Sequence, residues 1–152
     1  MNDSPDSAPE LRARALRLLA RREHSRAELA RKLAAHAENR AALERLLDAL
    51  ADRNQLSDER YAEERTRQLA RKYGAARIRL ELIAKGVAAD TAARLSSTSA
   101  DADFERARAI LARKYRLPAA GAAERAKRMR FLRGRGFGHE IIRRLLSSAD
   151  TQ

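Results

Sequence analysis

A seven-residue pattern occurs three times along the chain, and this repetition restricts the folds that the chain can adopt. The central copy, ELIAKGV from Glu81 to Val87, closes the longer stretch RIRLELIAKGV that begins at Arg77. The other copies are ELARKLA, from Glu28 to Ala34, and FLRGRGF, from Phe131 to Phe137, at distances of 53 and 50 residues. Such a period is typical of repeat proteins, in which each small unit buries its apolar face against its neighbours.

The first third of the chain predicts a tail and three helices. Residues 1–9 combine prolines, serines and aspartates, so we expect a disordered acidic tail outside the fold. From Glu10 onward, a first helix is predicted by apolar residues on one face: Leu11, Ala15, Leu18 and Leu19. Ser25 and Glu28 have the spacing of a capping box, which opens a second helix. A third helix ends near Asn54 and has this apolar face: Leu43, Leu46, Leu47 and Leu50.

The middle third repeats this arrangement. Ser57 is a suitable N-cap for a helix, and Gly74 is interpreted as the C′ residue that ends it. A helix from Ala75 to Lys85 and a short helix from Ala89 to Leu95 follow. The segment Ser96–Ala100 is interpreted as a linker because of its serines.

The last third again predicts three helices. Two of them run from Asp101 to Tyr115 and from about Ala120 to Arg133, and Pro118 separates them. The segment GRGFG, Gly134–Gly138, is interpreted as a helix C-cap and turn, because it follows a helix and lacks the Gly-Lys-Ser/Thr of a phosphate loop. A final helix has an apolar side of Ile141, Ile142, Leu145 and Leu146.

No segment alternates with the period of two that a strand requires, so the sequence predicts an all-α protein of three tandem three-helix repeats. The predicted repeats span residues 10–55, 56–100 and 101–149, and the second includes the serine-rich linker.

The charge of the chain is strongly positive and unevenly distributed. Lys and Arg number 33 against 21 Asp and Glu, a net charge of +12. Residues 101–152 carry 13 bases and 6 acids, a net of +7, whereas residues 1–54 carry +2 and residues 55–100 carry +3. A basic excess of this kind indicates a polyanionic partner, either nucleic acid or an acidic surface. The alternative is an arginine-rich surface that interacts only with water.

The sequence contains no pattern that indicates catalysis or metal binding. It has no cysteine, and its three histidines, His24, His36 and His139, lie far apart, so we expect them at the surface near helix ends. No serine stands in a nucleophile-elbow pattern. No apolar run approaches the ~20 residues that span a bilayer. We therefore expect a protein that is not an enzyme, holds no cofactor or metal and does not enter a membrane.

Basic residues are the candidate contacts for a polyanion. Six bases stand within eleven residues of the third unit, where Glu124 is the single nearby acid, so most must project into solvent. Arg77 and Lys85 are further candidates, although both have the i,i+4 spacing for an ordinary surface pair with Glu81, as Lys32 has with Glu28. The full candidate set is Arg71, Lys72, Arg77, Lys85, Arg113, Lys114, Arg125, Lys127, Arg128, Arg130, Arg133 and Arg135.

Aromatic residues are scarce, with three Phe, three Tyr and no Trp, so a surface that grips single strands by stacking on exposed rings is not supported. Tyr61, Tyr73 and Tyr115 are equally well interpreted as half-buried helix residues.

These motifs together resemble the RecX regulatory family. The resemblance covers about residues 11–148 and is most specific in the middle unit, where SDERYAEE and LARKYG lead into RIRLELIAKGV. The positions that match the family are Gly74, Ile78, Glu81, Leu82, Lys85, Gly86, Leu132, Arg135, Gly136 and Phe137. Most of these positions are structural, so the resemblance does not itself identify contact residues.

The resemblance implies a bacterial cytoplasmic protein whose three repeats form an elongated, curved array. Family members bind in the groove of the RecA–single-stranded DNA filament and inhibit strand exchange and ATP hydrolysis, which restrains recombination and the SOS response. We accordingly expect a monomer with the RecA filament and single-stranded DNA as partners, and duplex DNA as a further ligand left open.

The sequence is also compatible with two other functions. Trihelical units also occur in helix-turn-helix transcription regulators, which bind duplex DNA selectively and usually as dimers. A purely structural helical scaffold is the other alternative, in which the basic face only keeps the protein hydrated.

Overall fold

The computed structural model describes residues 4–148 of the chain. The described range contains nine α-helices and no strand. Their bounds are α1 (Ala8–Arg21), α2 (Arg26–Leu33), α3 (Arg40–Asp52), α4 (Asp58–Leu69), α5 (Ala75–Ala84), α6 (Ala89–Ser96), α7 (Ala100–Lys114), α8 (Gly121–Gly134) and α9 (His139–Ser148).

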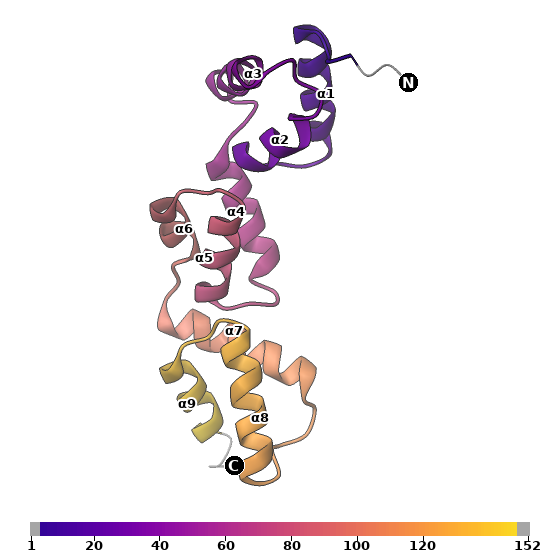
Figure 1. Ribbon diagram of the computed structural model, residues 1–152. Helices are drawn as coiled ribbons and strands as arrows, with labels where there is room; N and C mark the ends of the chain where they lie inside the picture. The colour runs from indigo at the N-terminus through magenta and orange to yellow at the C-terminus, as the bar shows by residue number, and fades with distance from the viewer. Residues whose placement is uncertain (1–3, 149–152) are drawn as a thin grey trace.

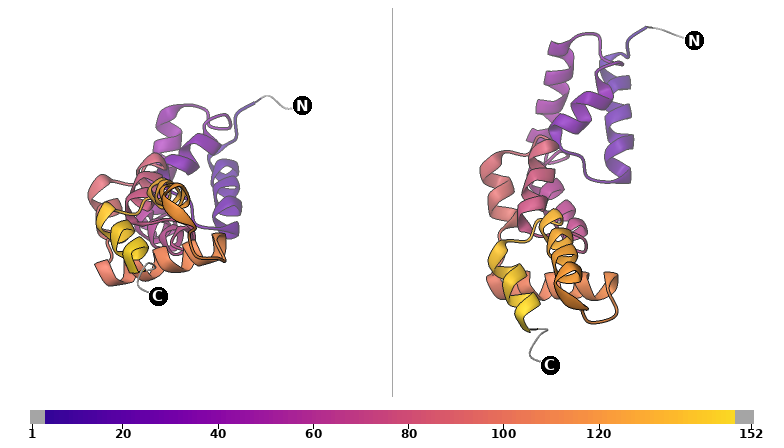
Figure 2. Two further views of the ribbon diagram at one scale, coloured as in Figure 1. Left: turned by 90° about the horizontal axis from the view of Figure 1, so that it is seen from below. Right: turned by 60° about the horizontal axis from the view of Figure 1, so that its bottom comes forward.

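The helices form three consecutive groups of three, arranged along one axis with α1 and α9 in the two end groups (Figures 1 and 2). We call α1–α3, α4–α6 and α7–α9 the first, second and third repeat. Each repeat has its own apolar core, around Leu47 in the first, Leu82 in the second and Leu132 in the third. The expected all-α fold of three tandem three-helix repeats is therefore confirmed, whereas the domain boundaries at 55/56 and 100/101 stay predictions.

Side-chain caps explain where several helices begin. Five N-cap side chains accept a hydrogen bond from a backbone N–H of the first turn: Ser7, Ser25, Asn39, Ser57 and Ser99. Each such cap is worth ~1 kcal/mol of helix stability. Of the predicted capping box, the structure shows one bond, from the N–H of Glu28 to Ser25 at 3.1 Å. The Glu28 carboxylate instead pairs with Arg22 at 2.7 Å.

The predicted disordered tail is wrong for the described residues 4–9, and residues 1–3 lie outside the described range. Asp6 pairs with Arg14 at 2.8 Å, and its N–H donates to the carbonyl of His36 at 2.8 Å. The Arg14 hydrogen bond lowers the pKa of the Asp6 carboxyl below its ordinary value. The helix begins at Ala8, earlier than predicted, and Ser7 caps its first turn.

Two predicted boundaries in the second repeat also need correction. Gly74 is not the residue that ends α4, because α4 stops at Leu69 and Gly74 is the N-cap of α5 with a φ of −83°. The predicted linker is shorter than expected, since Ser96 still belongs to α6 and α7 starts at Ala100. Ser99 acts there as an N-cap and not as part of a linker.

The middle helices of neighbouring repeats contact each other, α2 with the end of α5 and α5 with the end of α8. We call these contacts the first and the second joint, and at each of them a glycine permits the close approach. Gly86 follows α5 with a φ of +89°, and a Cβ there would lie 2.4 Å from the Cβ of Ala27 in α2. Gly136 follows α8 with a φ of +93°, and its Cβ would lie 2.4 Å from the Cβ of Arg77 in α5. No side chain fits at either position. The interpretation of GRGFG as a C-cap and turn is thereby confirmed.

A hydrogen bond closes each of these joints. At the first joint the hydroxyl of Ser25 donates to the carbonyl of Lys85 at 2.6 Å. At the second joint the backbone N–H of Gly74 donates to the carbonyl of Arg135 at 2.7 Å. In both cases the N-cap residue of one middle helix binds the C-cap residue of the next, so both joints share one design.

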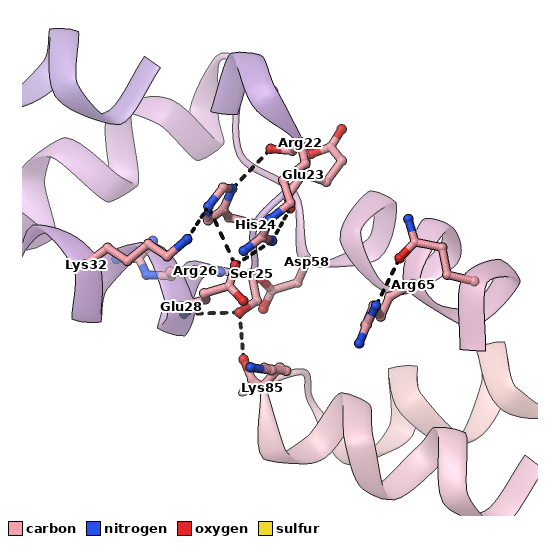
Figure 3. A network of polar contacts seen from close by, with 11 residues as sticks. Arg22, Glu23, His24, Ser25, Arg26, Glu28, Lys32, Asp58, Arg65 and Lys85 are labelled. Atoms are coloured by element: carbon pink, nitrogen blue, oxygen red, sulfur yellow. Dashed lines mark hydrogen bonds and ion pairs between the residues drawn. The ribbon is translucent and has the colours of Figure 1, made fainter. Parts of the chain in front are cut away.

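His24 lies inside the first joint, and its predicted surface position is wrong (Figure 3). It is only 1% exposed, with Nδ1 at 3.1 Å from the Arg22 carbonyl and Nε2 at 3.0 Å from the Lys32 ammonium. An ammonium only donates, so Nε2 accepts and the imidazole is neutral. Burial, together with the charges of Arg22 and Lys32, lowers the pKa of His24 below its ordinary value.

Glu28 is the other buried titratable group of this joint, at 6% exposure. Burial alone raises its pKa, but the hydrogen bond and charge of Arg22 outweigh burial, and the pKa of Glu28 ends below its ordinary value. The alternative of an ordinary Glu28–Lys32 surface pair is therefore wrong, because Glu28 pairs with Arg22 and Lys32 contacts His24.

Candidate nucleic-acid interface

A groove of about 600 Å³ lies where the second repeat meets the third. The turn after α4, the last turns of α7 and the C-terminal end of α8 form its walls. Its lining includes five bases and no acid: Arg71, Lys72, Tyr73, Ile110, Arg113, Lys114, Phe131 and Arg135. We call it the basic groove. The structure thus brings five of the twelve candidate residues into one place.

Three helix ends supply these charges. Arg71 and Lys72 lie in the turn that joins α4 to α5. Arg113 and Lys114 occupy the last turn of α7, and Arg135 is the C-cap of α8. A cation at a helix C-terminus is favoured by the partial negative charge of the free carbonyl groups there. The helix ends therefore help to offset the repulsion among the gathered bases.

Two arginines of the groove also fasten the joint between the repeats. Arg113 donates to the backbone carbonyl of Arg71, and Arg135 Nη1 donates to the carbonyl of Lys72 at 3.3 Å. A guanidinium has five N–H donors, so one bond to a carbonyl leaves other donors for a bound anion. The groove is consequently held in shape by the same side chains that can bind a ligand.

The two aromatic rings of the groove carry cations over their faces. The guanidinium carbons of Arg77 and Arg135 lie 4.9 and 5.4 Å from the ring centre of Tyr73. Lys114 and Arg135 stand 5.7 and 5.0 Å from the centre of Phe131. These are cation–π distances, and such contacts orient the charged groups. Neither ring is among the contact residues expected from the sequence, although Tyr73 directly follows the candidate Lys72 in the LARKY motif.

Arg77 and Lys85 lie outside the groove lining. Arg77 pairs with Glu81 at 3.1 Å and donates to the carbonyl of Gly134 at 3.3 Å, so it belongs to the second joint. Lys85 lies at the other end of α5 and lines a smaller pocket at the first joint, together with Tyr61 and acids such as Glu64. The structure therefore does not bring these two candidates together with the main basic cluster.

Lys127, Arg130 and Arg133 project from α8 into solvent. Within the described residues none of them forms an ion pair, so their charges remain open to a partner. Arg125 is half-buried and lines a depression between α8 and α9.

Arg128 is buried at 8% exposure, so the expectation that it projects toward a partner is wrong. Its Nη2 donates to the carbonyl of Leu117 at 2.7 Å and lies 3.4 Å from a Glu124 oxygen. Its guanidinium also lies 4.6 Å from the ring centre of Tyr115. Arg128 therefore positions the segment between α7 and α8, and the single acid near the cluster helps to compensate its charge.

Residues 4–148 contain no group of three or more His, Asp or Glu side chains that could hold a metal ion. In the same range, no helix is both long and apolar enough to cross a bilayer.

Comparison with known proteins places the chain in a family. Residues 101–146 match the family model of the RecX third three-helix domain, and residues 57–94 match that of the RecX second three-helix domain. A regulatory protein RecX from Leptothrix cholodnii is 45% identical over 140 residues, which cover 92% of this chain and 89% of that protein. The chain belongs to the RecX family. A further RecX protein, from Ralstonia nicotianae, is 42% identical over 146 residues, which cover 96% of this chain and 92% of the relative.

Two RecX crystal structures have the same fold. RecX from Lactobacillus salivarius superposes with a TM-score of 0.82 at 21% identity, over 95% of this chain and 97% of that one. A second structure, of a regulatory protein RecX, has a TM-score of 0.76 at 19% identity and covers 91% of this chain and 74% of the other. The curated relatives are named regulatory proteins, in agreement with the expected regulatory role.

Proposed function

We propose that this RecX family member binds the RecA–single-stranded DNA filament and inhibits the ATP hydrolysis and strand exchange of RecA. It thereby restrains recombinational repair and the SOS response. It acts in the cytoplasm as a monomer and by binding alone, without catalysis. Family membership supports the partner, and the acid-free basic groove is the observation that supports a polyanion contact.

In this proposal the basic groove binds phosphates. Arg71, Lys72 and Lys114 are exposed and supply charge, while Arg113 and Arg135 supply planar guanidinium donors suited to two oxygens at once. Arginine binds phosphate or carboxylate in this way, so acidic side chains of RecA are alternative occupants of the same donors.

The remaining candidates add contacts along the array. Lys127, Arg130 and Arg133 extend the positive surface along α8, whereas Arg77, Lys85 and Arg125 contribute charge from half-buried positions. An extended array that touches a filament at several repeats gains affinity because each contact raises the effective concentration for the next. Individually weak contacts are therefore sufficient.

The direct test measures RecA ATPase activity on single-stranded DNA at increasing concentrations of the protein. We expect inhibition at stoichiometric or lower ratios to RecA. An unchanged ATPase rate at a large excess of protein would contradict the proposal.

A matched pair of variants tests the groove. Lys72→Ala combined with Lys114→Ala removes two groove charges, and Arg40→Ala combined with Arg45→Ala removes two exposed charges from the first repeat. Each phosphate contact on a single strand contributes about 0.7 to the slope of log affinity against log salt. The groove variant should lower that slope by about 1.4 for a labelled oligo(dT), while the control variant leaves it unchanged.

A comparison of duplex sequences separates the proposal from a transcription regulator. Selective, tight binding to one duplex sequence over random duplex, without inhibition of RecA, would favour the regulator. Equal slopes for the wild type and both variants would instead favour the scaffold interpretation.

A further inference from the structure

The segment between α7 and α8 displays one large apolar side chain. Leu117 is 76% exposed, more than Leu80 at 60% and Ile83 at 40%, the other exposed large hydrophobics of residues 4–148. We propose that Leu117 contacts an unstacked base of the single strand whose phosphates lie in the basic groove. This inference rests on the proposed function and deepens it, because it assigns a base contact beside the phosphate contacts.

The backbone that carries Leu117 is fixed from within. Buried Arg128 donates to the Leu117 carbonyl at 2.7 Å, and its guanidinium lies over the ring of Tyr115. The Tyr115 ring in turn meets the groove residue Phe131 edge to face, with ring centres 5.8 Å apart. Contacts through Tyr115 and Arg128 therefore connect the groove residue Phe131 to the backbone of Leu117.

The residue after Leu117 restricts the segment further. Pro118 disfavours helical backbone angles at the preceding position, and the chain bends at Leu117 instead of continuing α7. A side chain displayed on a backbone that is already ordered loses little conformational entropy when it binds. Burial of the charged Arg128 side chain costs free energy, and this cost is accounted for if the function requires the segment that carries Leu117 to be held in place.

Leu117 lies close to the groove along the chain. It follows the groove residue Lys114 by three positions, so their Cα atoms are at most about 11 Å apart. Arg113, Lys114 and Arg116 precede it without an intervening acid. This charge favours a nucleic acid over an apolar protein pocket as the partner of the leucine.

In and beside the groove, cations occupy faces of the aromatic rings on which a base could stack. Cations already stand over the rings of Tyr73 and Phe131, and Arg128 stands over Tyr115. Leucine is among the apolar side chains that proteins insert between the base steps of duplex DNA, so its side chain can contact an exposed base face. Leu117 therefore supplies the apolar contact that the nearby rings do not.

The chain has no tryptophan, so Leu117→Trp creates a single fluorescent reporter at the proposed contact. We expect its emission to be quenched when oligo(dT) binds at low salt, because indole stacks on bases. Leu80→Trp is the matched control on α5, and its emission should not change. Unquenched emission at position 117, with oligo(dT) affinity intact by anisotropy, would overturn the base contact.

A second pair of variants measures how much Leu117 contributes to the affinity for oligo(dT). Leu117→Ala should weaken oligo(dT) binding by about fivefold, the lower end of the range for a base stacked on an aromatic side chain, and should leave the salt slope unchanged. Leu80→Ala should bind as the wild type does. Wild-type affinity in Leu117→Ala would refute this inference alone, whereas an unchanged RecA ATPase rate at a large excess of the wild-type protein would refute the proposed function as well. A response of Leu117→Trp to the RecA filament but not to free oligo(dT) would assign the leucine to a protein pocket and also overturn the inference.

Discussion

At the scale of single residues, Arg128 and Arg130 have opposite roles although they are two positions apart on α8. Arg128 is buried and satisfies the Leu117 carbonyl, whereas Arg130 is exposed and forms no ion pair within residues 4–148. Loss of the Arg128 side chain removes a hydrogen bond from a charged donor to the partly buried Leu117 carbonyl, and such a bond contributes ~1.5–3 kcal/mol. Arg128→Ala should therefore lower the free energy of unfolding by about that amount, measured by urea titration.

Arg130→Ala is the matched control, and it should change stability by less than about 0.5 kcal/mol. Under the proposed function Arg130→Ala should instead weaken oligo(dT) binding. Equal stability losses in the two variants would contradict the positioning role of Arg128.

His24 makes the stability of the protein depend on pH. Its folded-state pKa lies below the ordinary value near 6.5, so the unfolded chain binds more protons as the pH falls through that value. The free energy of unfolding should therefore decline below about pH 7, with a slope of at most ~1.4 kcal/mol per pH unit. His24→Gln should flatten this part of the profile, and His139→Gln, at an exposed position, should not. A wild-type stability that is flat from pH 7.5 to 5.5 would contradict the neutral, buried state of His24.

At the scale of elements, two serines cap a helix, but only one of them also bonds across a joint. Ser57 only caps α4, whereas Ser25 caps α2 and takes part in the first joint. Both hydroxyls accept a first-turn N–H, but Ser25 is buried and also donates to the Lys85 carbonyl at 2.6 Å. Ser57→Ala should cost ~1 kcal/mol, the usual value for a lost cap. Ser25→Ala should cost ~2–3 kcal/mol, because it also leaves a carbonyl at the joint without its donor. Thermal unfolding of the two variants measures the difference, and similar losses would show that the joint bond contributes little.

The sequence predicts individual helices well because their signals are local. The N-caps at Ser25 and Ser57 and the stop at Gly86 follow from neighbouring residues, and the structure confirms them. Gly74 was wrongly interpreted because its role depends on Gly136, more than sixty residues away, which leaves no room for a Cβ at Gly74. His24 was misplaced for the same reason, since the joint that buries it forms between different repeats.

The candidate site was predictable in composition but not in arrangement. The clustering of bases in residues 113–135 is visible in the sequence, and so is the basic pair at Arg71 and Lys72. The meeting of these segments in one groove depends on how the second repeat packs on the third. The burial of Arg128 could not be foreseen, because its partner is a backbone carbonyl in an irregular segment.

At the scale of the whole molecule, the three separate cores give each repeat its own local stability. Leu47 and Leu132 are both fully buried, the first in the core of α1–α3 and the second in the core of α7–α9 beside the basic groove. In a linear array each repeat contacts only its neighbours, so damage to one end spreads little to the other. Replacement of a buried leucine by alanine costs ~2–5 kcal/mol.

All eleven proposed contact residues lie after residue 70, so the first repeat supplies none of the proposed phosphate contacts. Leu47→Ala should therefore reduce hydrogen-exchange protection in α1–α3 but change oligo(dT) affinity less than about twofold, well under the ~1.4 kcal/mol of a tenfold change. Leu132→Ala should reduce protection in α7–α9 and weaken binding strongly, because Leu132 supports the helix that carries Phe131 and Arg135. Anisotropy with labelled oligo(dT) at one salt concentration compares the two variants. Equal losses of affinity would show that the first repeat either binds the strand itself or controls the groove through both joints.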